Sequence, residues 1–266
     1  MISGIQVSSF RPMMQNAEQM RETFQKIRKM GCDTVQLQWM DSTISPEEIA
    51  EILKETGLRA VSTQDFYENV MDRKEYFIRV NQMSGGTWVC VSGIPEKYMT
   101  SEGLWIFVRE MTELQTELES FGLKLCFHPR AREFTEAGGK DPVEFLVEHM
   151  PEDFMLCLDF YHISRAGLSM EKVVQKYRGK ICMVHFKDYR EGETGEILMP
   201  AGQGEIVWGE TVKECLKAEV VYGFVEQERW EKDAFVCLEE AFHWLKEATD
   251  DAERAEKESD NIASEL

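Results

Sequence analysis

The chain of 266 residues lacks paired-cysteine motifs and an excess of basic residues, and each absence excludes a class of protein. None of its seven cysteines forms a CxxC pair. This argues against a disulfide framework and against a zinc site built from thiolates. The 30 Lys and Arg residues are outnumbered by 49 Asp and Glu, and a net charge of −19 disfavours nucleic acid and anionic membranes as partners. No apolar run approaches the length of about 18 residues that suggests a membrane span.

Targeting and nucleotide-binding motifs are also missing. The first residues show no basic region followed by an apolar stretch, so with these free cysteines we expect a cytoplasmic protein. No GxGxxG follows the first apolar run and no P-loop occurs, which argues against an open nucleotide-binding sheet.

What the chain does contain is a regular alternation of apolar runs and helical patterns. The expected strands are 2–7, 34–39, 58–63, 87–95, 123–129, 154–160, 181–186 and 220–227. Helical patterns cover 16–31, 45–57, 101–122, 141–150, 169–179, 208–219 and 234–248. Such alternation predicts a parallel sheet covered by helices, and eight units favour an α/β fold closed as a (β/α)8 TIM barrel, which typically takes about 250 residues. We expect residues 1–248 to form this single domain and residues 249–266 to be an acidic, disordered tail.

Four of the expected strands end in a polar side chain that could bind a metal. These side chains are His128, Asp159, His185 and Glu226. A polar group at the end of an apolar run is costly to bury unless it is paired or bound, and the strand ends of a barrel meet at one mouth. We therefore expect a divalent metal at this mouth. Imidazole and carboxylate ligands suit Mn²⁺, with Mg²⁺, Co²⁺ and Zn²⁺ as alternatives.

Three further charged residues lie close to these strand ends. Lys187 shares a strand face with His185 and could stabilise an oxyanion or move a proton. Glu228 shares a face with Glu226, as a substrate contact or a solvated residue. Glu133 follows His128 by five positions and could reach back to the mouth, or be an exposed loop carboxylate.

Several motifs resemble the xylose isomerase-like barrels, in the branch called sugar phosphate isomerases/epimerases. These motifs are GIQVSSFR (4–11), KLCFHPRAREF (124–134), LDFYHISRAG (158–167), HFKD (185–188), PAGQGEIVWGE (200–210) and VEQE (225–228). The loop PAGQGEIVW has no evident structural need, which makes its match informative.

The resemblance implies that Asp159, His185 and Glu226 are metal ligands. His128 stands where the family usually has a glutamate as fourth ligand, and Glu133 is the alternative. The family's chemistry implies proton transfer beside a carbonyl by carboxylates, here Glu226 and Glu133, through a metal-stabilised enediolate.

The chain departs from the family's motifs at four positions near the mouth, which carry Gln64, Pro129, Arg130 and His162. We expect Arg130, His162 and Gln64 to contact the substrate. Arg130 and His162 could adapt the pocket to an anionic or larger glycosidic substrate.

The sequence thus predicts a metal-dependent isomerase or epimerase of a sugar or sugar derivative, with a small carbohydrate as its partner and a homo-oligomer as a possible assembly. A lyase on the same site, either a dehydratase or a deglycosidase of a 3-keto glycoside, is the first alternative. A non-catalytic sugar-binding barrel is the second.

Overall fold

The computed structural model describes residues 1–135 and 141–264, with side chains up to residue 258. Its strands are β1 Ile2–Gln6, β2 Thr34–Gln38, β3 Arg59–Phe66, β4 Trp88–Ser92, β5 Lys124–His128, β6 Met155–Asp159, β7 Ile181–Phe186, β8 Asp188–Gly192, β9 Gly195–Met199 and β10 Tyr222–Val225. The α-helices are α1 Ala17–Lys29, α2 Pro46–Thr56, α3 Tyr67–Asp72, α4 Lys74–Ser84, α5 Ser101–Ser120, α6 Pro142–His149, α7 Phe160–Arg165, α8 Met170–Lys176, α9 Gly209–Lys217 and α10 Ala234–Ser264. Short 3₁₀ helices are η1 Val7–Met13, η2 Glu96–Tyr98 and η3 Ala131–Phe134.

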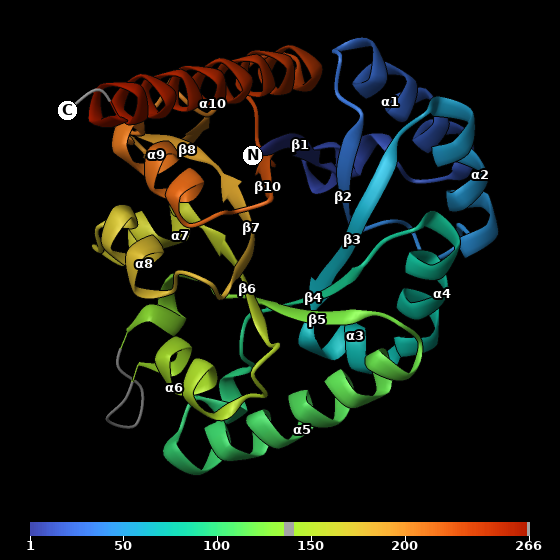
Figure 1. Ribbon diagram of the computed structural model, residues 1–266. Coiled ribbons are helices and arrows are strands. Elements are labelled where there is room, and N and C mark those ends of the chain that lie inside the picture. Colours follow the sequence, from blue (N-terminus) through green and yellow to red (C-terminus); the bar gives the residue numbers. More distant parts are fainter. Residues whose placement is uncertain (136–140, 265–266) are drawn as a thin grey trace.

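Eight of the strands close into a parallel barrel in the order β1-β10-β7-β6-β5-β4-β3-β2, with helices around its outside (Figure 1). This architecture confirms the predicted TIM barrel. Because all eight strands run parallel, their C-terminal ends form one rim, and the side chains that follow them share one mouth. No helix among the described residues combines the length and apolar character needed to cross a bilayer.

Helix α2 shows how local sequence sets an element's limits. Ser45 accepts a hydrogen bond from the backbone of Glu48, whose carboxylate accepts one from the Ser45 backbone N–H in return. Pro46 occupies the first turn, and Gly57 ends the helix in the left-handed conformation at φ 70°. The start and end of α2 agree with the helix predicted for residues 45–57.

Two connections contain structure that the sequence pattern did not predict. The chain between β3 and β4 forms α3 and α4, where Phe77, Ile78 and Val80 are buried at helical spacing. The long loop expected after β7 contains the antiparallel hairpin β8–β9. The strands of this hairpin contain few apolar residues in alternating positions, so the sequence pattern does not identify them as strands.

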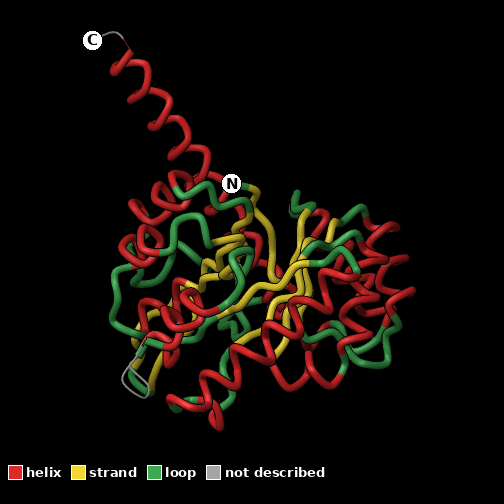
Figure 2. Tube along the Cα trace, turned by 60° about the horizontal axis from the view of Figure 1, so that its bottom comes forward, coloured by secondary structure: helices red, strands yellow, loops and turns green. Residues whose placement is uncertain are grey.

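The C-terminal segment also differs from the expected disordered tail, because α10 continues to Ser264 and projects from the barrel (Figure 2). Its sequence contains several Ala and Glu residues, which favour helix. Thr249 and Ala252 are buried, and Glu253 forms an ion pair of 3.2 Å with the amino group of Met1. These contacts hold the first turns of the segment on the barrel. The division at residue 248 stays a prediction.

Candidate metal centre

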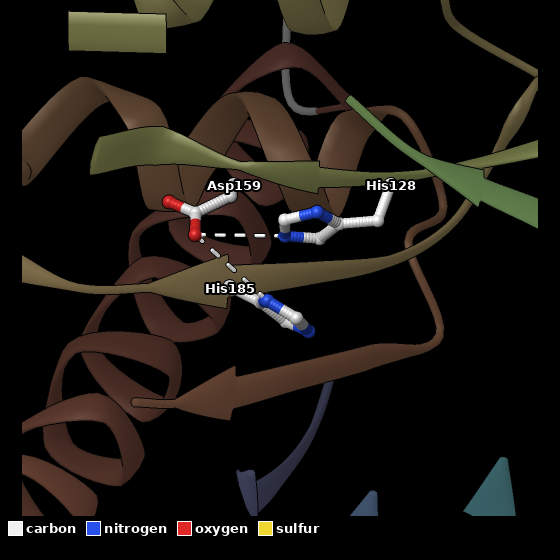
Figure 3. A group of neighbouring side chains, drawn as sticks. All are labelled: His128, Asp159 and His185. Carbon is white, nitrogen blue, oxygen red and sulfur yellow. Dashed lines mark ion pairs between the residues drawn. The ribbon is translucent and has the colours of Figure 1, made fainter. Parts of the chain in front are cut away.

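Three strand ends bring metal-ligating atoms together at the mouth. His128 ends β5, Asp159 ends β6 and His185 lies in β7, and the three side chains point at one another (Figure 3). One ligand atom from each lies within 4.8 Å of the others. His128 Nε2 is 3.6 Å and His185 Nδ1 is 4.0 Å from Asp159 Oδ2. Atoms that each bind one cation at about 2.1 Å lie about 3–4 Å apart, so these separations fit a shared ion.

The hydrogen bonding of the two imidazoles also fits a cation. Both rings are buried, yet neither His128 Nε2 nor His185 Nδ1 makes a well-formed hydrogen bond to any described residue. The carboxylate oxygens that face them belong to Asp159 and, 3.1 Å from His185 Nδ1, to Glu226. Buried polar atoms in native proteins are nearly always paired. Because these two nitrogens converge on the Asp159 carboxylate without well-formed hydrogen bonds, this residue set suits a divalent metal.

A row of buried glutamines sets the orientation of His185. His185 Nε2 lies 2.6 Å from Gln36 Oε1, and this amide oxygen can only accept a hydrogen bond, so Nε2 carries the proton. The Gln36 amide is itself fixed, because Gln6 donates to Oε1 at 2.9 Å and Nε2 donates to Gln64 at 3.1 Å. In the neutral ring that metal binding requires, Nδ1 would then present its lone pair to an ion held beside Asp159 and Glu226.

We expect Gln36→Leu to weaken Mn²⁺ binding by about 10- to 100-fold, because the His185 ring loses the acceptor that selects its tautomer. Calorimetric titration with Mn²⁺ measures the affinity, and ¹⁵N NMR of the Zn²⁺-loaded protein reports the tautomer. Gln82→Leu, on the exposed face of α4, is the matched control. A folded Gln36→Leu variant with unchanged Mn²⁺ affinity would show that Gln36 does not position the ring.

Glu226 follows β10 and approaches the cluster through His185, with 3.1 Å between Oε2 and His185 Nδ1. Its other oxygen accepts a hydrogen bond of 3.0 Å from Ser8. Burial alone would raise the Glu226 pKa, but the charge of Lys187 and, while no metal is bound, that of protonated His185 outweigh it and lower the pKa to about 2. Glu226 is therefore ionised at neutral pH, beside the three clustered residues.

Lys187 points into the same region as a buried cation. Its Nζ lies 2.7 Å and 2.6 Å from the two carboxylate oxygens of Glu228 and 4.9 Å from the ring centroid of Tyr161. Burial alone would lower the Lys187 pKa, but the carboxylates of Glu226, Glu228 and Asp159 together raise it. The ammonium thus stays charged next to the metal-ligating cluster.

Glu133 and Gln64 are placed differently from the other predicted residues. Glu133 is fully buried, and its carboxylate accepts hydrogen bonds from the backbone N–H groups of Ile94 and Arg130 and from the Arg132 guanidinium. It braces the loop after β5, and the structure does not bring it into the cluster. Gln64 belongs to the buried glutamine row, donating to Gln38 at 3.4 Å.

His162 and Arg130 form the wall beside the cluster. His162 Nε2 lies 4.0 Å from Asp159 Oδ2, and its ring meets that of His128 edge-on with 5.7 Å between centroids. Burial lowers the His162 pKa to about 4, against the raising effect of Asp159, so the ring is neutral at physiological pH. The Arg130 guanidinium lies over the ring of Phe66.

The motif PAGQGEIVW has a structural reason that its sequence does not reveal. The carboxylate of Asp188, next to Lys187, accepts hydrogen bonds from the backbone N–H groups of Gly202, Gly204 and Ile206 and from the indole of Trp208. A Cβ at Gly204 would lie 2.2 Å from Asp188 Oδ1. The loop therefore wraps around one buried carboxylate.

We expect Asp188→Ala to lower the free energy of unfolding by about 3 kcal/mol or more, because the buried Trp208 indole and three partly buried backbone N–H groups lose a charged acceptor. Urea denaturation measures the change. Val207→Ala, in the same loop with an exposed side chain, serves as the control and should change stability by less than about 0.5 kcal/mol. Equal stability of the two variants would contradict the proposed role of Asp188.

A comparison with family models matches residues 24–255 to the xylose isomerase-like TIM barrel. The chain belongs to this family. The family match agrees with the resemblance in the sequence motifs and with the closed barrel. A comparison with curated proteins finds no significant match.

Solved structures of the xylose isomerase-like family and its relatives share this fold. A sugar phosphate isomerase/epimerase from Parabacteroides distasonis has a TM-score of 0.75 at 14% identity, with 93% of each chain covered. The probable 3-DHS dehydratase AsbF from Bacillus anthracis has a TM-score of 0.71 at 14% identity, covering 92% of this chain and 99% of its own. The IOLI protein, whose structure contains a zinc atom, has a TM-score of 0.71 at 17% identity, covering 95% and 98%.

The strand-end pattern did not single out the residues that support the cluster. Gln6, Gln36 and Gln38 lie in apolar strand segments, where a buried amide needs a partner just as a buried carboxylate does. Glutamines in apolar strand segments therefore indicate buried amides that hydrogen-bond to one another or to a site residue. Ser8 and Ser92, which contact Glu226 and His128, carry no such signal because serine is common near strand ends.

Proposed function

We propose that this protein is a metal-dependent isomerase or epimerase of a keto sugar or sugar derivative. The observation that carries the proposal is the convergence of His128 Nε2 and His185 Nδ1, two buried nitrogens without a well-formed hydrogen bond, on Asp159. When bound, the divalent cation would polarise the carbonyl of the substrate. We propose Mn²⁺ as this ion. Co²⁺ and Zn²⁺ also suit the ligands, whereas Mg²⁺ is disfavoured by two imidazoles.

In this proposal His128, Asp159 and His185 hold the ion, and Glu226 completes the set through its position next to His185. Glu226 is ionised, so it can accept the proton from the carbon beside the carbonyl and return it. Glu133 is the weaker candidate for this role because its oxygens are already bound by three donors.

Lys187 would stabilise the negative charge that develops on the substrate oxygen when the proton leaves. Its ammonium is buried and charged, and Glu228 holds it in place through both carboxylate oxygens. His162, neutral and next to Asp159, would contact the substrate from the side of β6.

A lyase is the second candidate, because removal of the same proton can be followed by loss of a neighbouring group. The similarity of fold to a probable dehydratase supports keeping this candidate.

Incubation of the Mn²⁺-loaded protein with a panel of keto sugars in D₂O, followed by NMR, separates the candidates. Deuterium incorporated at carbon without loss of a group supports the isomerase or epimerase. Expulsion of a hydroxyl or an aglycone identifies a lyase. Bound Mn²⁺ with no exchange in any sugar of the panel would contradict both and favour a sugar-binding barrel.

A further inference from the structure

An open pocket of about 320 Å³ lies beside the metal-ligating cluster on the side of β5 and β6. His162, which approaches Asp159, forms part of its wall. Three of its lining residues are arginines, although the chain as a whole is strongly acidic. The lining residues are Arg130, Ala131, Arg132, Tyr161, His162 and Arg165.

Two of the three arginines are already committed to acidic partners. Arg132 donates to Glu96 at 2.8 Å, to Glu133 at 2.7 Å and to the carbonyl of Ile94. Arg165 donates to Glu191 at 2.8 Å, and its Nε lies 3.5 Å from Glu196. These two guanidinium groups shape the pocket but have little capacity left for a ligand.

Arg130 differs from them. Among the described residues its guanidinium forms no hydrogen bond, its Nε is buried without a partner, and the nearest carboxylate oxygen, on Glu133, is 3.9 Å away. That carboxylate is already bound by three other donors. One third of the Arg130 side chain is exposed, at 33%. A partly buried guanidinium without an acceptor is unusual, because each of its donors normally finds one.

The position of Arg130 is fixed by its packing. Its guanidinium lies over the Phe66 ring at 5.5 Å from the centroid. It also lies against Gly93, where a Cβ would come within 2.6 Å of Nε. A glycine at φ +70° therefore leaves the space that the guanidinium occupies. A fixed, planar guanidinium is pre-organised to bind an oxyanion with two parallel hydrogen bonds.

We propose that Arg130 binds the carboxylate of an acidic sugar in this pocket, while the reacting carbonyl of the same molecule lies at the metal-ligating cluster. The inference rests on the proposed function and names the class of its substrate. A single uncommitted guanidinium matches one monoanionic carboxylate. A dianionic phosphate would need further free donors, which Arg132 and Arg165 do not supply.

Calorimetric titration of the Mn²⁺-loaded protein with matched sugars tests this assignment. The probes are D-glucuronate and D-glucose, D-galacturonate and D-galactose, and D-glucose 6-phosphate. We expect at least one uronate to bind about 10-fold or more tightly than its neutral partner, and more tightly than the phosphate. Arg130→Gln should remove this preference while leaving Mn²⁺ affinity within about threefold, since Arg130 contributes no ligand atom to the cluster.

Arg130→Lys retains the positive charge but cannot form two parallel hydrogen bonds to a carboxylate, so it should lose part of the preference for the uronate. This second variant keeps the test informative if Arg130→Gln folds poorly. Arg59→Gln, at the opposite, N-terminal end of strand β3, is the matched control and should bind like the wild type. Equal or undetectable binding of all sugars overturns the assignment, as does an unchanged preference in both Arg130 variants or tighter binding of the phosphate. The Mn²⁺ titration, carried out first, shows separately whether the proposed metal function holds.

Discussion

A chain with Asn in place of Asp159 will bind Mn²⁺ at least about 100-fold more weakly than the wild type and will not catalyse exchange of substrate protons with solvent. Asp159 supplies the carboxylate on which His128 Nε2 and His185 Nδ1 converge. Asn has nearly the same shape but no charge, so the two imidazoles lose the anionic ligand that completes the set. Calorimetry gives the affinity, and NMR in D₂O gives the exchange.

The same substitution leaves the local fold intact, because Asp159 Oδ1 caps helix α7 by accepting from the backbone of His162, and an Asn oxygen accepts equally well. Asp141→Asn is the matched control, since Asp141 caps α6 in the same way. It should match the wild type in both assays. Mn²⁺ affinity retained in folded Asp159→Asn would exclude Asp159 as a ligand.

Lys187→Met combined with Glu228→Gln will reduce the rate of proton exchange by about 100- to 1000-fold, because the developing oxyanion loses its cationic partner. The two substitutions are made together, since removal of Lys187 alone would leave the Glu228 carboxylate buried without its cation. Mn²⁺ affinity should change far less than in Asp159→Asn. Rate measurements at saturating Mn²⁺ isolate the effect on the chemical step.

Glu228→Gln alone is the control for this pair. The Gln oxygen still accepts a hydrogen bond from Lys187, so we expect a smaller loss of rate than in the double variant. If the double variant exchanges protons as fast as the wild type, Lys187 stabilises no charge in the transition state.

The barrel and its mouth could be predicted because they depend on regular features of the sequence. Buried parallel strands read as apolar runs, and His128, Asp159 and His185 each stand out as polar residues at such a strand's end. Since parallel strands end on one rim, their proximity followed from the fold. The structure brings His128 into the cluster as fully as Asp159 and His185.

Contacts between segments far apart in the chain could not be predicted in this way. Glu133 lies five residues from His128, but Arg132 and two backbone N–H groups turn its carboxylate into the loop. The pocket combines arginines from the loop after β5 with Arg165 of α7, which depends on the packing of that helix. In the described part of the chain, Arg130 lacks a hydrogen-bond acceptor because no free carboxylate lies next to it. The sequence around each arginine does not show where such carboxylates lie in the fold.

Anomalous scattering from crystals of the Mn²⁺-loaded protein tests the central claim most directly. We expect one strong peak bounded by His128 Nε2, Asp159 Oδ2 and His185 Nδ1, at about 2.0–2.3 Å from each of them and with Glu226 alongside. A peak at another place, or no peak here at saturating Mn²⁺, would contradict the claim that these three residues hold a metal.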